Sequence, residues 1–134
     1  MELYEFEPWI TVVTPYPQES ISHFIGRFER ANQWSAYQIG RVTGMGGVIS
    51  RWKKLYFNPF PSQEELEKLA EVVEVSVEDL RLLLPSKTVT LQPRPIRLCA
   101  ACCVETPCHL IKWQFKGLTA CDRHRLRLLE KCPK

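Results

Sequence analysis

Two pairs of metal-ligand residues lie in the last third of this 134-residue chain. Cys99 and Cys102 form the first pair, Cys121 and His124 form the second, and each pair has a two-residue spacer. Such a spacer lets a tight turn direct two ligands at one ion, and two turns complete a tetrahedron. Three thiolates and one imidazole favour Zn²⁺ over harder cations. The spacing therefore predicts a zinc site made by these four residues.

The same ligand set argues against catalysis. A catalytic zinc needs an open coordination position and a nearby general base. Here four ligands are already present, and no His-x-Glu or His-Glu-x-x-His pattern occurs. Cysteine nucleophiles need a histidine and an orienting third group, and metal ligation explains each Cys–His pair better. We therefore expect a structural zinc ion and no enzymatic activity.

The residues around the ligand pairs predict a zinc ribbon. Residues 109–116 alternate between two faces, as a strand does, and Gly117 ends the alternation. Asp122 is placed to cap a helix that carries the leucines at 126, 128 and 129. A unit this small buries little apolar surface, so the metal would supply most of its folding energy.

Three further cysteines remain. We interpret Cys103 and Cys108 as buried thiols; the alternative is that one of them replaces a ligand. Cys132-Pro-Lys134 is typical of the first half of a Cys-Pro-x-Cys knuckle. We therefore expect a second zinc element to be truncated at the end of this chain.

Charge divides the chain in two. Residues 1–91 carry a net charge of −3 and no cysteine, whereas residues 92–134 carry +6 and all six cysteines. The prolines of Leu91-Gln-Pro-Arg-Pro95 disfavour a helix at this boundary. We predict a helical domain over 1–90, a linker over 91–95 and a zinc-ribbon domain over 96–134. No signal peptide or membrane span is recognisable, which predicts a cytoplasmic protein with reduced cysteines.

The front part has the periodicity of short helices. An amphipathic helix is expected from about residue 19 to Asn32, a second after Ser35, and a third over 48–57. The glycines at 44–47 are interpreted as a turn, because a phosphate-binding loop would need a preceding strand and a following Gly-Lys-Ser/Thr. Residues 9–13, a tryptophan followed by four β-branched residues, could form an edge strand or an arm on a partner.

Two helices over 62–84 resemble a helix-turn-helix. Ser62 with Glu65 forms a capping box, and Ser76 starts the second helix. The turn position that often holds glycine is Glu74. Seven acidic residues against two basic ones in this unit would repel DNA. We therefore expect this unit to serve packing or protein binding. The predicted fold class is mainly α: a helix-turn-helix-type domain and a small C-terminal zinc ribbon.

Two groups of side chains are candidates for contacts. In the front part, the candidate partner-binding residues are Trp9, Arg51, Lys53 and Lys54; the alternative is a solvated helix face over a core tryptophan. In the back part, Trp113 and Phe115 could stack on bases if they are exposed. The candidate nucleic-acid-binding residues there are Arg97, Lys112, Lys116, Arg123, Arg125 and Arg127.

Both halves of the chain resemble one family. The segment from Pro15 to Asn32, PYPQESISHFIGRFERAN, is similar to the opening of TniQ proteins, where Pro, Glu-Ser, an aromatic residue, Arg and a final Asn recur. The two ligand pairs, Trp113 and the Leu-rich segment ending in Cys132-Pro resemble the TniQ zinc region. His23 and Phe24 depart from the Ser-Trp of many members. The short length is similar to that of the small TniQ proteins of type V CRISPR-associated transposons.

The resemblance implies a target-selection adaptor for transposition. Such proteins link an RNA-guided CRISPR effector complex, with its guide and tracr RNA, to a TnsC-like AAA+ ATPase filament on DNA. In the family the helical part meets the ATPase and the zinc region lies toward the RNA complex. The resemblance also implies a bacterial cytoplasmic protein. DNA would be contacted indirectly or non-specifically, and no membrane or small-molecule substrate is expected. The alternative is a zinc-containing helix-turn-helix transcriptional regulator that binds DNA.

Overall fold

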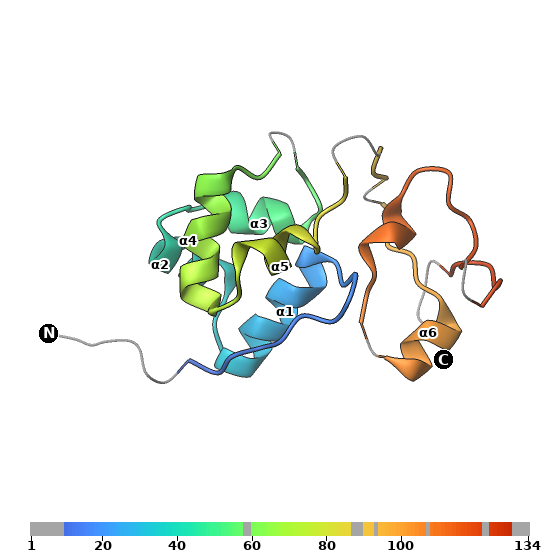
Figure 1. The fold of residues 1–134 in the computed structure, drawn as a ribbon, viewed down its shortest axis with the longest axis horizontal. Coiled ribbons are helices and arrows are strands. Elements are labelled where there is room, and N and C mark those ends of the chain that lie inside the picture. The colour runs from blue at the N-terminus through green and yellow to red at the C-terminus, as the bar shows by residue number, and fades with distance from the viewer. Residues whose placement is uncertain are drawn as a thin grey trace, which may run out of the picture.

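The computed structural model describes residues 10–57, 60–86, 90–92, 94–106, 108–121 and 124–129. These residues form six α-helices and one short 3-10 helix, with no strand, which confirms the predicted mainly helical fold. Figure 1 shows the first five α-helices grouped together and the sixth lying apart from them. In chain order the elements are α1 (Ile21–Asn32), α2 (Ala36–Thr43), α3 (Val48–Lys53), α4 (Gln63–Val73), α5 (Val77–Arg81), α6 (Ala100–Glu105) and η1 (Ile111–Gln114).

Serine caps begin four of the front helices. The hydroxyl of the serine before each helix accepts a hydrogen bond from the backbone N–H three residues later, at α1, α2, α4 and α5. At α4, Glu65 also accepts from the N–H of Ser62, so the predicted capping box is present. Capping satisfies N–H groups that have no partner within the helix. These local signals explain why the starts of these four helices can be predicted from the sequence.

One hydrophobic core holds the front helices together. Helices α1 and α2 both pack on α3, and α4 packs on α5 and α2. The fully buried side chains include Trp52 of α3 and the aromatic pair of α1. These residues repeat at the spacing of one helix face, so each helix buries one apolar stripe. The largest of them are Ile21, Phe24, Ile25, Phe28, Ile39, Ile49, Trp52, Leu66, Leu69 and Leu80.

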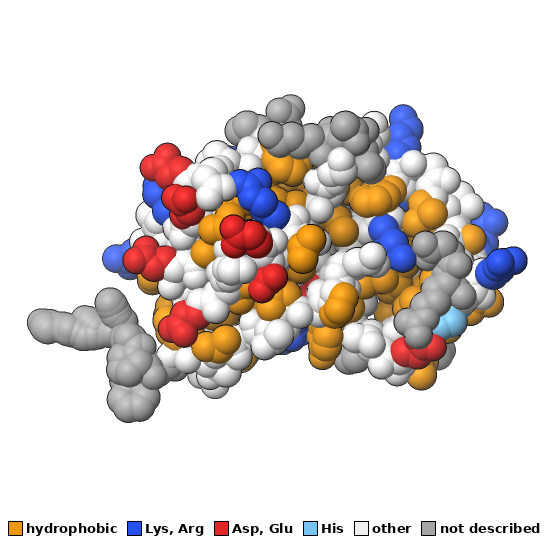
Figure 2. Space-filling model, viewed as in Figure 1, with side chains coloured by type: hydrophobic (Ala, Val, Ile, Leu, Met, Phe, Trp, Pro, Cys, Tyr) orange, Lys and Arg blue, Asp and Glu red, His pale blue; other side chains and the backbone are white. Residues whose placement is uncertain are grey.

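Helices α4 and α5 are joined through a turn at Glu74. This residue ends α4 in the left-handed region at φ 60°, and its N–H donates to the carbonyl of Ala70. The conformation that favours glycine is thus occupied by a glutamate, as the sequence indicates. Most acidic side chains of these two helices are exposed, and Figure 2 shows acidic groups gathered on this side of the molecule.

A second, smaller core lies in the back part. It is made of Cys99, Cys102, Trp113, Cys121 and Leu128, all buried, and it shares no residue with the front core. Two predictions about this region are wrong. Residues 111–114 form the 3-10 helix η1 in place of a strand. The described residues 124–129 form no helix, because Arg127 pairs with Ala120 and Leu129 with Leu98 as isolated antiparallel bridges.

The segment before α1 is fixed without forming a strand. Asn32 at the end of α1 accepts from the N–H of Thr11 at 2.6 Å and donates to its carbonyl at 3.0 Å. The expected edge strand at 9–13 is therefore absent from residues 10–13, and Trp9 lies outside the described residues. The terminal Asn of the TniQ-like motif thus has a structural role.

The segment predicted as a linker is bound to the back part where it is described. Leu91 pairs with Phe115, and the N–H of Gln92 donates to the carbonyl of Gln114 at 2.7 Å. The Gln114 amide donates in turn to the carbonyls of Gln92 and Pro95. A buried amide that satisfies neighbouring backbone groups fixes the path of this segment. Among the described residues, no helix has the length and hydrophobicity needed to cross a bilayer.

Candidate metal centre

The four predicted ligands come from two segments that meet at the second core. Cys99 precedes the first residue of α6, and Cys102 lies in the first turn of that helix. Cys121 follows the bridge residue Ala120, and His124 lies in the turn after it. All three cysteines are buried, and the histidine is partly buried. The structure therefore brings together the four residues that the spacing predicts.

The distances between the donor atoms fit a tetrahedral ion. All four donor atoms lie within 4.8 Å of one another. The Sγ atoms of Cys102 and Cys121 are 3.6 Å apart, and Nδ1 of His124 lies 3.2 Å from Sγ of Cys102 and 3.6 Å from Sγ of Cys99. A tetrahedron with metal–sulfur distances of about 2.3 Å, as for Zn²⁺, has S–S edges of about 3.8 Å. These residues could hold a metal ion.

Protonation of the thiols bears on metal binding. Burial, reinforced by the neighbouring sulfurs of Cys121 and Cys99, raises the pKa of Cys102 to about 12. A metal ligand must be a thiolate, so binding an ion here releases protons. A cluster of uncharged thiols at this spacing has few favourable interactions, whereas a dication would hold the same sulfurs as thiolates.

Glu105 at the end of α6 orients the histidine. Its Oε2 lies 2.9 Å from Nε2 of His124, so Nδ1 of the same ring faces the sulfurs. The hydrogen bond to Glu105, followed by that to Cys121, raises the pKa of His124 to about 9. A carboxylate on the outer nitrogen of a ligand histidine fixes its tautomer and ring orientation. Glu105 was not predicted from the sequence, because a glutamate three residues after a cysteine has no distinctive pattern.

Of the other cysteines, the two that the structure describes lie outside the ligand cluster. Cys108 is buried and Cys103 is partly buried, as expected for thiols in packed positions. Burial, with the nearby carboxylate of Glu19, raises the pKa of Cys108 to about 11, which makes it a poor nucleophile. Cys132, the first residue of the expected second knuckle, lies outside the described residues.

Three of the six predicted nucleic-acid-binding residues are exposed. Arg97 is only 8% exposed, and its guanidinium donates to the backbone carbonyls of Leu118 and Phe115, so it stabilises the interior. Trp113 is fully buried and cannot stack on a base. Lys112 is partly buried, Arg123 lies outside the described residues, and the exposed cations are Lys116, Arg125 and Arg127.

The predicted partner-binding residues are also divided. Arg51 and Lys54 are exposed at the end of α3. Lys53 is partly buried, and its Nζ pairs with Oε1 of Glu29 at 2.8 Å. The charge of Lys53 is therefore neutralised within the chain, whereas the side chains of Arg51 and Lys54 are exposed to solvent.

The motif residues of the first helix form a buried ion-pair network. Glu19 is completely buried, and Arg27 donates to its two carboxylate oxygens at 2.8 and 2.7 Å. The guanidinium of Arg27 also lies over the ring of Tyr16 at 4.3 Å. Burial alone would raise the pKa of Glu19, but hydrogen bonds from Arg27, from His23 and from the N–H of Tyr16 hold it below the ordinary value. This network was not predicted from the sequence.

Comparison with protein-family models matches residues 10–128 to TniQ. The chain belongs to the TniQ family. The match spans both the buried Glu19 network and the four ligands, so it covers the helical part and the metal centre together. This places the chain in a family associated with transposition and confirms the resemblance seen in the sequence. A comparison with curated proteins gave no match.

Proposed function

We propose that this TniQ protein is a target-selection adaptor for transposition. It links an RNA-guided CRISPR effector complex of the type V kind to a TnsC-like AAA+ ATPase filament on DNA. The observation that carries the proposal is the family match, which spans both parts of the chain. An adaptor needs two contact surfaces, and the two separate cores of this chain supply a unit for each.

The charges of the two units suit different partners. The exposed side of α4 and α5 is acidic and would be repelled by a nucleic acid backbone. Exposed cations of the back part, Lys116, Arg125 and Arg127, can contact phosphates. In the proposal the helical part binds the ATPase, with Arg51 and Lys54 at the contact, and the back part lies against the RNA of the effector complex.

Zinc is the proposed ion of the metal centre, and its role is structural. Three thiolates and one imidazole are the ligand type that zinc prefers in closed, four-ligand sites. A bound ion would cross-link the segment that holds Cys99 and Cys102 to the segment that holds Cys121 and His124. Cys99, Cys102, Cys121 and His124 would hold it, and Glu105 would hold the proton on the outer nitrogen of the histidine.

A cosedimentation experiment with the full chain tests the adaptor role. The ATPase is assembled with ATP on duplex DNA, and the effector is loaded with its RNA. We expect the effector to sediment with the filament only when the TniQ chain is present. Absence of binding to the filament would overturn the proposal. Tight, sequence-selective binding of the isolated chain to duplex DNA would instead favour a transcriptional regulator.

Charge-reversal variants assign the two surfaces. We expect Arg51→Glu with Lys54→Glu to lose filament binding and to keep effector binding. Lys116→Glu with Arg127→Glu should show the reverse. The matched control is Arg30→Glu with Arg41→Glu, which reverses two exposed charges of the helical part outside the proposed contact. Equal losses for all three double variants would point to non-specific electrostatics.

A further inference from the structure

The loop between the two ligand pairs contacts the start of α1. The N–H of Ser20 donates to the carbonyl of His109 at 2.7 Å, and the N–H of Ile111 donates to the carbonyl of Gln18 at 3.1 Å. Glu19 and Leu110 form an antiparallel bridge between these bonds. Residues 109–111 therefore pair with the backbone that leads into α1, although about 90 residues separate the two segments in the chain.

Side chains extend the contact into both units. The hydroxyl of Ser20, which caps α1 by accepting from the N–H of His23, is also hydrogen-bonded to Nδ1 of His109 at 2.8 Å. Nε2 of His109 bonds to Oε1 of Gln114 at 3.1 Å. Ser20 and Gln114 are completely buried. Buried hydrogen-bonding groups are costly to leave without partners, so these bonds define one arrangement of the two segments.

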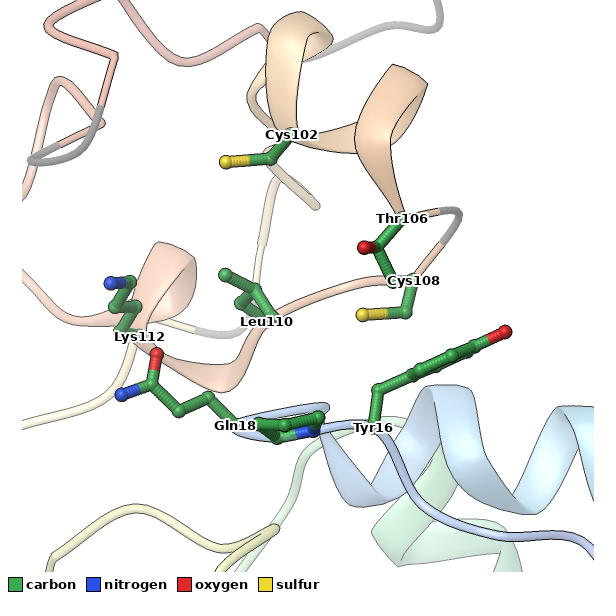
Figure 3. Close-up of a pocket in the computed structure, with 8 residues that line it drawn as sticks. Tyr16, Gln18, Cys102, Thr106, Cys108, Leu110 and Lys112 are labelled. Carbon is green, nitrogen blue, oxygen red and sulfur yellow. The ribbon is translucent and has the colours of Figure 1, made fainter.

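A cavity of about 230 Å³ lies beside this contact. Figure 3 shows Tyr16 and Gln18 on one side of it and Cys108 and Leu110 on the other. Cys102, one of the four ligands, also lines this space. The wall of the cavity is thus shared between the metal centre and the segment before α1. A shift of α6 would change the surroundings of that segment.

We propose that His109 is a positioning residue that couples metal binding to the attachment of the back part to α1. The inference rests on the metal site proposed above and does not depend on the adaptor role. The ligand pairs close residues 103–120 into a loop, and the core at its base has five buried residues in the part of the chain that the structure describes. Without the ion the two ends of this loop are no longer cross-linked, so its bonds to Ser20 and Gln18 weaken.

Coupling of this kind is reciprocal. If the ion stabilises the contact between His109 and Ser20, then that contact must strengthen ion binding by the same factor. A metal-loaded chain would therefore present its two units in one fixed orientation, which suits a protein that joins two large assemblies. The front core shares no residue with the metal centre, so α4 should be insensitive to the metal.

Hydrogen exchange measures the first direction of the coupling. The full chain is compared after loading with Zn²⁺ and after removal of the metal with a chelator. We expect the amides of Ser20 and Ile111, which donate across the contact, to exchange about tenfold faster without metal. The amide of Leu66 in α4, which donates to Ser62 at 3.0 Å, serves as the internal control and should not change.

Zinc affinity measures the reverse direction. Competition with a chromophoric chelator should show that His109→Ala weakens zinc binding about tenfold, although this residue is not a ligand. His109→Asn keeps a polar atom near the position of Nδ1 and should restore part of the affinity. Val104→Ala is the matched control, because Val104 is 87% exposed on α6. A residue with a structural role only would lower the melting temperature and leave zinc affinity unchanged.

A double variant links the effect to the partner residue. As a single variant, Ser20→Ala should weaken zinc binding. In the His109→Ala background it should cause no further loss of zinc affinity, because the same contact is already lost. Equal exchange of Ser20 and Ile111 with and without zinc would overturn the coupling and leave the metal site intact. Failure of the wild-type chain to bind zinc would overturn both. The two failures are therefore distinguishable.

Discussion

Nε2 of His124 lies 2.9 Å from Oε2 of Glu105, while Nδ1 of the same ring faces the sulfurs of Cys99, Cys102 and Cys121. One imidazole thus connects the ligand cluster to the end of α6. Glu105 follows Cys102 by three residues, so the helix that positions this ligand also positions the carboxylate that orients the histidine. The metal centre is built on one short helix and one turn.

Removal of the Glu105 carboxylate is expected to weaken metal binding. Outer partners of ligand histidines typically contribute about 10- to 100-fold in metal affinity. We predict that Glu105→Ala lowers zinc affinity at least tenfold in a chelator competition assay at neutral pH. Val104→Ala changes the neighbouring exposed residue and should leave the affinity unchanged. Equal affinities of the two variants would show that Glu105 does not orient the ligand.

The buried Glu19 carboxylate predicts a pH dependence of stability. Its pKa is lowered in the folded chain, so its ionisation stabilises the fold above the ordinary carboxyl pKa of about 4.3. That contribution is lost as the pH falls below this value toward the lower pKa of the folded state. We expect the free energy of unfolding, measured with urea, to fall on acidification.

Glu19→Gln isolates this contribution. The variant leaves Arg27 without its counter-charge, and breaking a buried ion pair in this way costs about 3 kcal/mol. We expect that loss at pH 7 and a smaller further loss on acidification than in the wild type. Glu71→Gln alters an exposed glutamate of α4 and serves as control. Identical urea midpoints for the two variants at pH 7 would contradict the structural role of Glu19.

The backbone at Gly40 lies close to that of Gly46, so adding a methyl group at Gly40 should have a measurable effect on stability. A Cβ at Gly40 in α2 would clash with the carbonyl oxygen of Gly46 in the following turn. We expect Gly40→Ala to destabilise the helical part by about 1–3 kcal/mol, because the obstacle is backbone and cannot rotate away. A Cβ at Gly47 would meet no atom within 4 Å. Gly47→Ala should therefore keep the wild-type melting temperature, and a fall equal to that of Gly40→Ala would refute the close approach.

The front helices and the four ligands could be predicted because their signals are local. Ser62 and Glu65 cap α4 within one turn, and each ligand pair spans four residues. Helix α6 was not predicted, although it begins directly after Cys99. Its sequence, Ala-Ala-Cys-Cys-Val-Glu, is short and has no serine or aspartate cap, so neither capping nor periodicity distinguishes it.

The errors in the back part have a common physical cause. Alternation over 109–116 predicts a strand only if one face is buried, but Trp113 and Gln114 are neighbours and both are buried. The Gln114 amide bonds to backbone groups of residues 92, 95 and 97, which lie far away in the sequence. Contacts of this range decide the local structure of a small unit. A sequence pattern does not contain them.

The buried Glu19 network also could not be derived from periodicity. Glu19 precedes α1, and the bond between Ser20 and His109 joins residues 89 positions apart. The TniQ-like motif marked Glu19, Ser20, an arginine and Asn32 as recurrent without explaining them; the arginine that binds Glu19 is Arg27. In the structure all four fix the path of the chain before α1, either by ion pairing, by capping or by binding the backbone of Thr11.

The metal centre is tested most directly by the metal content of the purified full chain, measured by inductively coupled plasma mass spectrometry. One zinc ion per chain is predicted for the wild type and for Cys103→Ser, because Cys103 lies outside the ligand cluster. Cys102→Ser removes a ligand and should lose the zinc together with the order of the back part. A Cys102→Ser chain that keeps a full equivalent of zinc and a folded back part would contradict the ligand set.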